Sequence, residues 1–139
     1  MNQVSVGSNC KFKPNQIVCL EHENTYLYSE VIEVVESRQT CWVRPLMLVV
    51  GSPGSELLSL VSPDQLSLYD LRLGADLLWP ISLFRPAVDT EVIPLLLQLD
   101  DQAAQVAHNG SHNSQEAHKK LSFFVHQVWQ VYKRGFQAL

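Results

Sequence analysis

Two β-rich runs joined by a short polar break dominate the pattern of hydrophobic and polar positions along the chain. The first covers residues 26–36 and the second covers residues 39–50. Runs rich in valine, isoleucine, tyrosine and tryptophan that are bounded by polar residues are typical of strands. The pattern therefore predicts a long hairpin. Pro45 lies inside the second arm and has no N–H for a strand ladder, so we expect a bulge or a sheet edge there.

Shorter apolar runs on both sides of this hairpin predict further strands. Residues 16–20 form one run, and residues 77–80 and 81–86 form two more that are interrupted by prolines. Several short strands separated by turn residues favour a small barrel or a sandwich. We therefore assign residues 14–86 to one β-barrel unit.

The spacing of apolar residues becomes helical after residue 86. It predicts one helix over residues 90–106 and a second from about residue 113 to Gly135. The second helix has large apolar side chains on one face: Leu121, Phe124, Val125, Val128, Val131, Tyr132 and Phe136. We expect residues 87–139 to form a helical extension that packs on the barrel or on a partner subunit, and a homodimer through the last helix is the alternative.

The distribution of charge argues against a nucleic-acid binder. The chain has 139 residues and a formal net charge of -4. Residues 1–100 carry six basic and twelve acidic side chains, whereas residues 101–139 carry four basic and two acidic ones. Nucleic-acid binding draws much of its affinity from neutralised phosphates, so RNA binding is the weakest function that we consider. A chain of this length buries about two thirds of its unfolded surface and needs no disulfide or metal.

Cysteine use and hydropathy predict a cytoplasmic protein that does not enter a membrane. The three cysteines, Cys10, Cys19 and Cys41, include no close pair, so we expect buried thiols and no disulfide framework. Residues 1–25 lack the apolar region of a signal peptide. No apolar run approaches the ~20 residues of a membrane span.

Three histidines near the C-terminus are the only candidate metal ligands that we weigh. His108 and His112 have the spacing of a helical zinc pair, and His118 follows them. A zinc hydrolase of that kind also needs a glutamate beside the first histidine, where this chain has Asn109. Gly110 would weaken the helix that aims both rings. The sequence therefore predicts a solvated polar loop, with no metal site and no cofactor.

Candidate catalytic groups are equally sparse. Glu30 and Glu36 share one face of a regular strand and Glu33 lies on the other, which suits a charged surface that prevents edge pairing. Cys41 has no histidine near it in sequence, and the serines lack the glycine-flanked motif of a nucleophile. We therefore expect no catalytic residues and a protein that is not an enzyme.

Aromatic and apolar side chains are the better candidates for a binding surface. Small barrels often bind peptides through grooves lined by aromatic rings, and Tyr26, Tyr28 and Trp42 would form such a groove here. On the last helix, the candidate contacts are Phe124, Val128 and Tyr132. The alternative for the rings is a place in the core.

Several stretches also resemble known proteins. Gln16-Ile-Val-Cys-Leu, Ser29-Glu-Val-Ile-Glu-Val-Val and Cys41-Trp-Val-Arg-Pro resemble the first three strands of an SH3-like barrel. Leu71-Arg-Leu-Gly-Ala-Asp-Leu-Leu-Trp-Pro and Asp89-Thr-Glu-Val-Ile-Pro-Leu-Leu are similar to an uncharacterised cyanobacterial protein family. The second resemblance implies no known activity and transfers no functional residue.

The sequence thus predicts an α+β protein with an SH3-like small β-barrel followed by two C-terminal α-helices. Its predicted function is that of a non-enzymatic protein-protein interaction or accessory module that self-associates through the helical part. One alternative is a small enzyme or ligand-binding protein with a pocket between barrel and helices. The other is a weak RNA binder.

Overall fold

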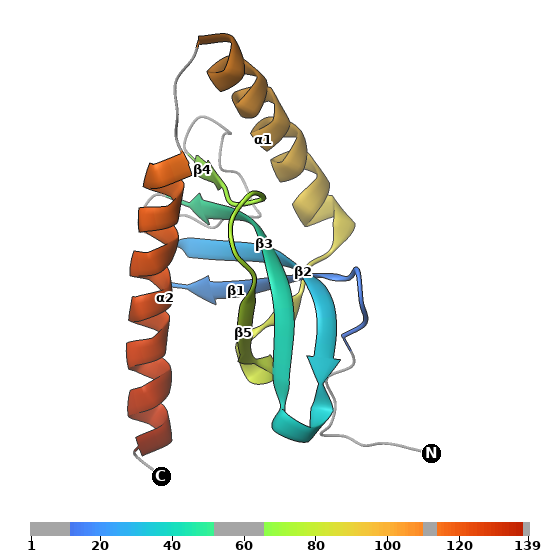
Figure 1. The fold of residues 1–139 in the computed structure, drawn as a ribbon, viewed down its shortest axis with the longest axis vertical. Helices are drawn as coiled ribbons and strands as arrows, with labels where there is room; N and C mark the ends of the chain where they lie inside the picture. Colours follow the sequence, from blue (N-terminus) through green and yellow to red (C-terminus); the bar gives the residue numbers. More distant parts are fainter. Residues whose placement is uncertain (1–11, 52–65, 110–113, 138–139) are drawn as a thin grey trace.

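The computed structural model describes residues 12–51, 66–109 and 114–137. In these ranges, six strands form one antiparallel sheet, and two helices follow them along the chain (Figure 1). The strands are β1 (Ile17–His22), β2 (Thr25–Val35), β3 (Thr40–Val50), β4 (Ser67–Asp70), β5 (Leu77–Pro80) and β6 (Arg85–Pro86). The helices are α1 (Asp89–Asn109) and α2 (Ser114–Gln137). The α+β class and the C-terminal position of both helices are confirmed.

The predicted hairpin is formed by β2 and β3, which a 3-10 helix, Glu36–Arg38, connects. Its register shifts near Pro45, because Tyr28 lies opposite Met47 whereas Ser29 lies opposite Pro45. β3 therefore has one extra residue at this point. The expected bulge is confirmed, and β3 turns through a wide bend in Figure 1.

The two halves of β3 have different neighbours on the side away from β2. Residues 47–50 pair with β4, and residues 40–43 pair with β5. β6 pairs with β1 at the far side of the sheet, which gives the order β4-β3-β2-β1-β6 with β5 as a branch on β3. Pro45 lies between the two sets of pairs, where β3 needs no N–H for either neighbour.

The predicted barrel is not confirmed, because the sheet is open. In the order given above, β4 and β6 are the terminal strands, and they do not pair with each other within the described ranges. The stretch 81–86 was expected to be a strand, but it contains a 3-10 helix, Ile81–Leu83, before the two-residue strand β6. A strand of two residues is too short to close a barrel.

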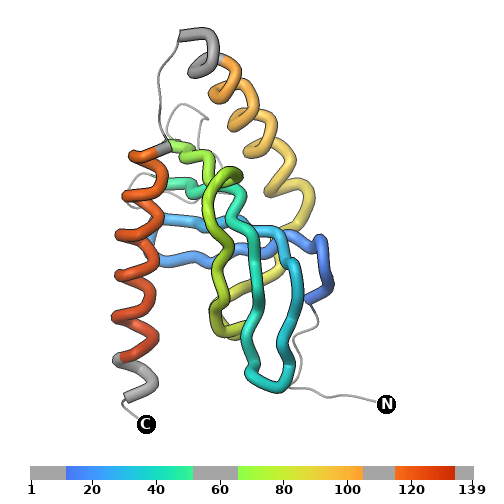
Figure 2. Tube along the Cα trace, in the orientation of Figure 1, coloured from blue at the N-terminus to red at the C-terminus, as the bar shows by residue number. Residues whose placement is uncertain are grey.

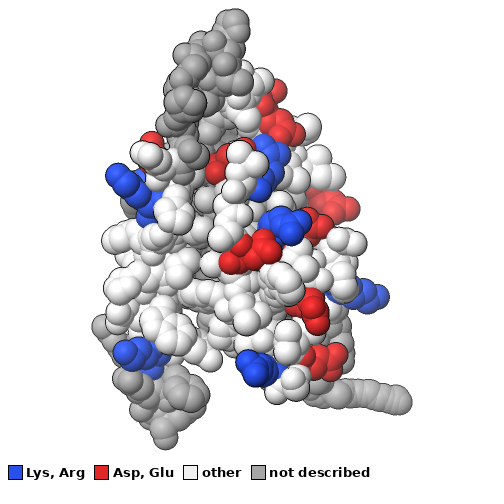
Figure 3. Space-filling view, in the orientation of Figure 1, with Lys and Arg blue, Asp and Glu red and all other residues white. Residues whose placement is uncertain are grey.

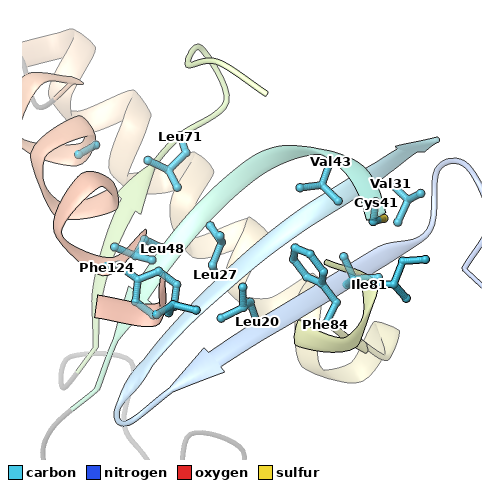
Figure 4. Packing of buried hydrophobic residues seen from close by; sticks show 13 residues of the cluster. Leu20, Leu27, Val31, Cys41, Val43, Leu48, Leu71, Ile81, Phe84 and Phe124 are labelled. Atoms are coloured by element: carbon cyan, nitrogen blue, oxygen red, sulfur yellow. The ribbon is translucent and has the colours of Figure 1, made fainter. Parts of the chain in front are cut away.

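Each face of the sheet is covered by one helix. On one face, α2 contributes Ala117, Phe124 and Val128 to a core that includes Leu27 and Val43. Figure 4 shows Phe124 of α2 directed at the leucines of three strands. On the other face, the core contains the α1 residues Val92, Leu95 and Leu99 together with Cys19, Tyr26, Tyr28, Met47, Val49 and Leu68. The central strands are therefore buried on both sides.

The last helix thus packs on its own sheet, which was the first of the two expectations for it. It extends to Gln137, so Gly135 does not end it as predicted. Its predicted start at Asn113 lies outside the described residues. Neither α1 nor α2 is long and apolar enough, over its described part, to cross a membrane.

Two adjacent phenylalanines of α2 test this packing. Phe124 is 2% exposed and Phe123 is 64% exposed. We expect Phe124→Ala to lower the free energy of unfolding by about 3–5 kcal/mol, because it leaves a cavity in the core. Phe123→Ala is the matched control and changes this free energy by about 0.5 kcal/mol or less. Urea unfolding followed by circular dichroism measures both, and equal losses would contradict the described position of α2.

Candidate functional site

The predicted aromatic groove does not form as a unit. Tyr26 and Tyr28 are buried between the sheet and α1, so in the folded chain they belong to the core. Trp42, on the other arm of the hairpin, points to the same face of the sheet as the two tyrosines, yet it is 39% exposed. The reason is that α1 packs on the first half of β2 and the second half of β3 but leaves the first half of β3 open. Trp42 is therefore the one exposed member of the predicted set.

Most of the predicted contact residues on the last helix are also buried within the protein. Phe124 and Val128 are buried against the sheet. Tyr132 is half-buried, and its ring lies 5.6 Å from the ring of Trp129. The exposed apolar surface of α2 consequently consists of other residues.

A groove of about 490 Å³ lies between β5 and α2. Figure 2 shows β5 running between β3 and the C-terminal half of α2. Its lining is predominantly apolar and aromatic: Leu78, Trp79, Pro80, Ser122, Val125, His126 and Trp129.

Two tryptophans join the walls of this groove. The ring centroids of Trp79 and Trp129 are 6.4 Å apart and their planes meet at 73°, which is a favourable edge-to-face geometry. Trp79 is opposite Cys41 in the ladder and packs against the sheet core. Trp129 is 45% exposed, so its ring closes one side of the groove and still faces solvent.

A second apolar surface lies on the other face of β5. Leu78 is paired with Trp42 in the ladder, so both side chains point the same way, and Leu78 is 57% exposed. Asp76 accepts a hydrogen bond of 2.9 Å from the Trp42 indole N–H and one of 3.3 Å from Arg44. These bonds fix the Trp42 ring beside Leu78. Apolar side chains thus stand on both faces of β5.

Within the described residues, the edge of β5 between these two faces pairs with no further strand. Ile81 donates its backbone N–H to Gln39 at 3.0 Å, which fixes the hydrogen-bonded positions of the β3–β5 ladder. Because such positions alternate in an antiparallel pair, Leu77 and Trp79 bond to β3, whereas the N–H and C=O of Leu78 point away from it. Among the described strands, only β3 pairs with β5. Pro80 follows and offers only a carbonyl on this edge.

The surface of α2 around the groove is basic. Lys119, Ser122, His126, Trp129 and Lys133 recur at intervals of three and four residues, so they form one stripe along the helix. The middle three line the groove and the two lysines extend the stripe at its ends. Figure 3 shows basic side chains at both ends of α2 and uncharged surface between them. Glu116 is the one acidic residue of the helix.

The groove lacks the grouping of side chains that metal or acid–base chemistry needs. No set of three or more His, Cys, Asp or Glu residues able to hold a metal occurs in the described part of the chain. Of the groove residues, only Ser122 and His126 carry reactive groups. His126 interacts with Gln130 at 3.4 Å, and the side chains of His108 and His112 lie outside the described set.

A buried polar network holds α1 on the opposite face of the sheet. Glu91, in the first turn of α1, accepts two hydrogen bonds from Arg85, of 2.8 and 3.1 Å, and one from the Tyr28 hydroxyl. Glu91 is buried, and Arg85 also lies 3.6 Å from Glu21 of β1. Residues of three elements therefore meet at the Glu91 carboxylate, and Arg85 links them to β1.

The network determines the protonation of its members. Burial alone would raise the pKa of Glu91, but the hydrogen bonds from Arg85 and Tyr28 outweigh it, so this pKa is lower than usual. Burial and the bond to Glu91 raise the pKa of the Tyr28 phenol. Burial also raises the pKa of the neighbouring Cys19 thiol to about 12. The network is therefore an ion pair with a neutral phenol and a neutral thiol beside it. Its role is structural.

Sequence reasoning missed the two most exposed apolar residues of the groove region. Trp129 lies outside the apolar stripe of the last helix, and a tryptophan among polar neighbours was the signal for it. Leu78 belongs to a run that is apolar throughout, which conceals the residue that faces solvent. Trp79 was placed only in the strand predicted over residues 77–80.

Comparison with family models, with curated proteins and with solved structures finds no match to this chain.

The buried ion pair predicts a defined response to pH. We expect Glu91→Gln to lower the free energy of unfolding at pH 7 by about 1–3 kcal/mol, because charged hydrogen bonds of Arg85 are lost. A carboxyl with a lowered pKa stabilises the fold above its unfolded pKa of about 4.5, and this contribution is lost as the pH falls. The difference in the free energy of unfolding between the parent chain and the Glu91→Gln variant therefore narrows from pH 5 to pH 2 in urea titrations. A difference that is constant over this range would contradict the assignment.

The environment of Cys19 predicts an unreactive thiol. At pH 8 a pKa of about 12 leaves far less thiolate than an ordinary cysteine has, and the side chain is buried. We expect iodoacetamide to label Cys19 at least about a hundredfold more slowly in the native protein than in 8 M urea. Peptide mapping by mass spectrometry measures both rates, and comparable rates would show that β1 opens readily.

Proposed function

We propose that this chain is a non-enzymatic protein-interaction module that binds a partner in the groove between β5 and α2. One observation carries the proposal. Leu78 and Trp129 line a concave, mostly apolar surface and remain exposed, and the exposed Trp42 stands beside Leu78. Aromatic residues in such positions supply much contact area at a small entropic cost.

The finer parts of the sequence-based expectation belong to the same proposal. The order of a short strand, a 3-10 helix and a final strand that returns to β1 is the feature that supports an SH3-like ancestry for the open sheet. The buried cysteine side chains at positions 19 and 41, which are not joined in a disulfide, suit a reducing cytoplasm. Membership of the cyanobacterial family rests on the sequence resemblance alone.

The location of the groove also supports a second candidate function. The alternative of a pocket between the β-unit and a helix matches where the groove lies, and its apolar lining suits a small apolar ligand. The groove is open to solvent along its length, however, and a segment of protein fits an open groove better than an enclosed ligand does.

We also propose self-association through the last helix, but through residues other than those expected from the sequence. Phe124 and Val128 are buried within the chain, so a second copy would contact Phe123 and Val131, which are exposed. Sedimentation velocity at tens of micromolar tests this point. A strict monomer would remove self-association and leave the groove as the contact surface.

A peptide selection tests the proposed function. We expect random dodecapeptides displayed on phage and selected on the immobilised full chain to include binders whose affinity depends on Leu78. Because Leu78→Lys places a charge in the apolar surface, synthetic versions of these peptides should bind this variant at least about tenfold more weakly. Fluorescence anisotropy with labelled peptides measures the affinities.

The matched control is Leu97→Lys, which introduces the same charge at a similarly exposed leucine of α1 that does not line the groove. It should leave the affinities unchanged. The proposal fails if the selection returns no binder, or if both variants bind the peptides as the parent chain does.

A further inference from the structure

We infer that the partner of this groove is an extended segment with acidic flanks that adds to the free edge of β5 as a further strand. The inference rests on the proposed function and specifies the conformation and the charge of the partner. Three features of the described residues support it: the unpaired backbone groups of Leu78, the apolar side chains on both faces of β5, and the basic stripe of α2.

The outward-facing backbone groups of β5 can hydrogen-bond to an added strand. The N–H and C=O of Leu78 point away from β3, and they are spaced as one hydrogen-bonded position of an antiparallel or parallel ladder. A segment in extended conformation would satisfy both groups. A helical partner bonds its own backbone groups internally and would leave those of Leu78 to water.

The side chains of β5 suit the alternation of a strand. Successive residues of an added strand point to opposite faces of the sheet. One set would contact Leu78 and Trp42, and the other set would enter the groove against Trp79, Val125 and Trp129. The partner therefore needs apolar residues at consecutive positions, as a strand that is buried on both faces has.

The lysines around the groove favour a partner segment with acidic residues on both sides of its centre. Lys119 and Lys133 are exposed at the two ends of the stripe, and fourteen residues of helix place their backbones about 21 Å apart. An extended segment covers this distance in about six residues. None of the groove's lining residues is acidic, and Asp76, which bonds to Trp42, is paired with Arg44. A segment with acidic residues about six positions apart, on either side of an apolar centre, is complementary to this surface.

Backbone methylation of the bound peptide tests the conformation. The probes are the synthetic peptides from the selection whose affinity depends on Leu78, each N-methylated at one position at a time. For a strand, methylation weakens binding about tenfold at positions whose N–H faces β5 and has little effect at the neighbours, so the losses alternate. Losses at every central position, or at none, would overturn strand addition and leave the proposed function standing.

Charge reversal tests the flanks. We expect the double variant Lys119→Glu, Lys133→Glu to bind the same peptides about tenfold more weakly in 50 mM salt, and the difference should shrink in 500 mM salt. Lys13→Glu, a reversal of an exposed lysine before β1, is the control and leaves the affinity unchanged. Tighter binding to the double variant, or selected peptides without acidic residues, would overturn the acidic partner.

Discussion

The bend of β3 at Pro45 is the constraint on which the arrangement of the other elements depends. Proline has no N–H for a ladder, and the extra residue beside it shifts the register against β2. The two halves of β3 therefore run in different directions and pair with β4 and β5 separately. A straight β3 would have one continuous neighbour on this side. The bend leaves β5 as a short branch whose outer edge lies beside α2.

Each of the two helices buries one face of the sheet. α1 is anchored on one face by the apolar residues around Leu99 and by the carboxylate of Glu91, which three hydrogen bonds satisfy. α2 covers the other face through Phe124 and Val128 but extends beyond the central strands. The same stretch of α2 presents Ser122, Val125, His126 and Trp129 on its adjacent face, beside β5, and these residues line the groove. The candidate site is thus a consequence of how α2 packs and of strand branching.

Much of the fold could be predicted because periodicity is a local property. The hairpin, β1, β5 and both helices follow from runs of a few residues. β4 was not predicted, and of the strand expected over residues 81–86 only β6 forms, since the pairing of both depends on strands distant in sequence. For Tyr26 and Tyr28, alternation correctly placed both rings on one face, but it could not indicate that α1 covers that face. Trp42 was predicted as a contact and remains exposed because α1 does not reach the first half of β3.

Amide hydrogen exchange in the protein without a partner tests most directly whether the outer edge of β5 is free. If it is, protection alternates along β5: β3 protects the Leu77 and Trp79 amides, and the Leu78 amide exchanges rapidly. Nuclear magnetic resonance resolves these three amides individually. Protection of Leu78 equal to that of Trp79 would show that its N–H already has a partner, and would contradict a free edge.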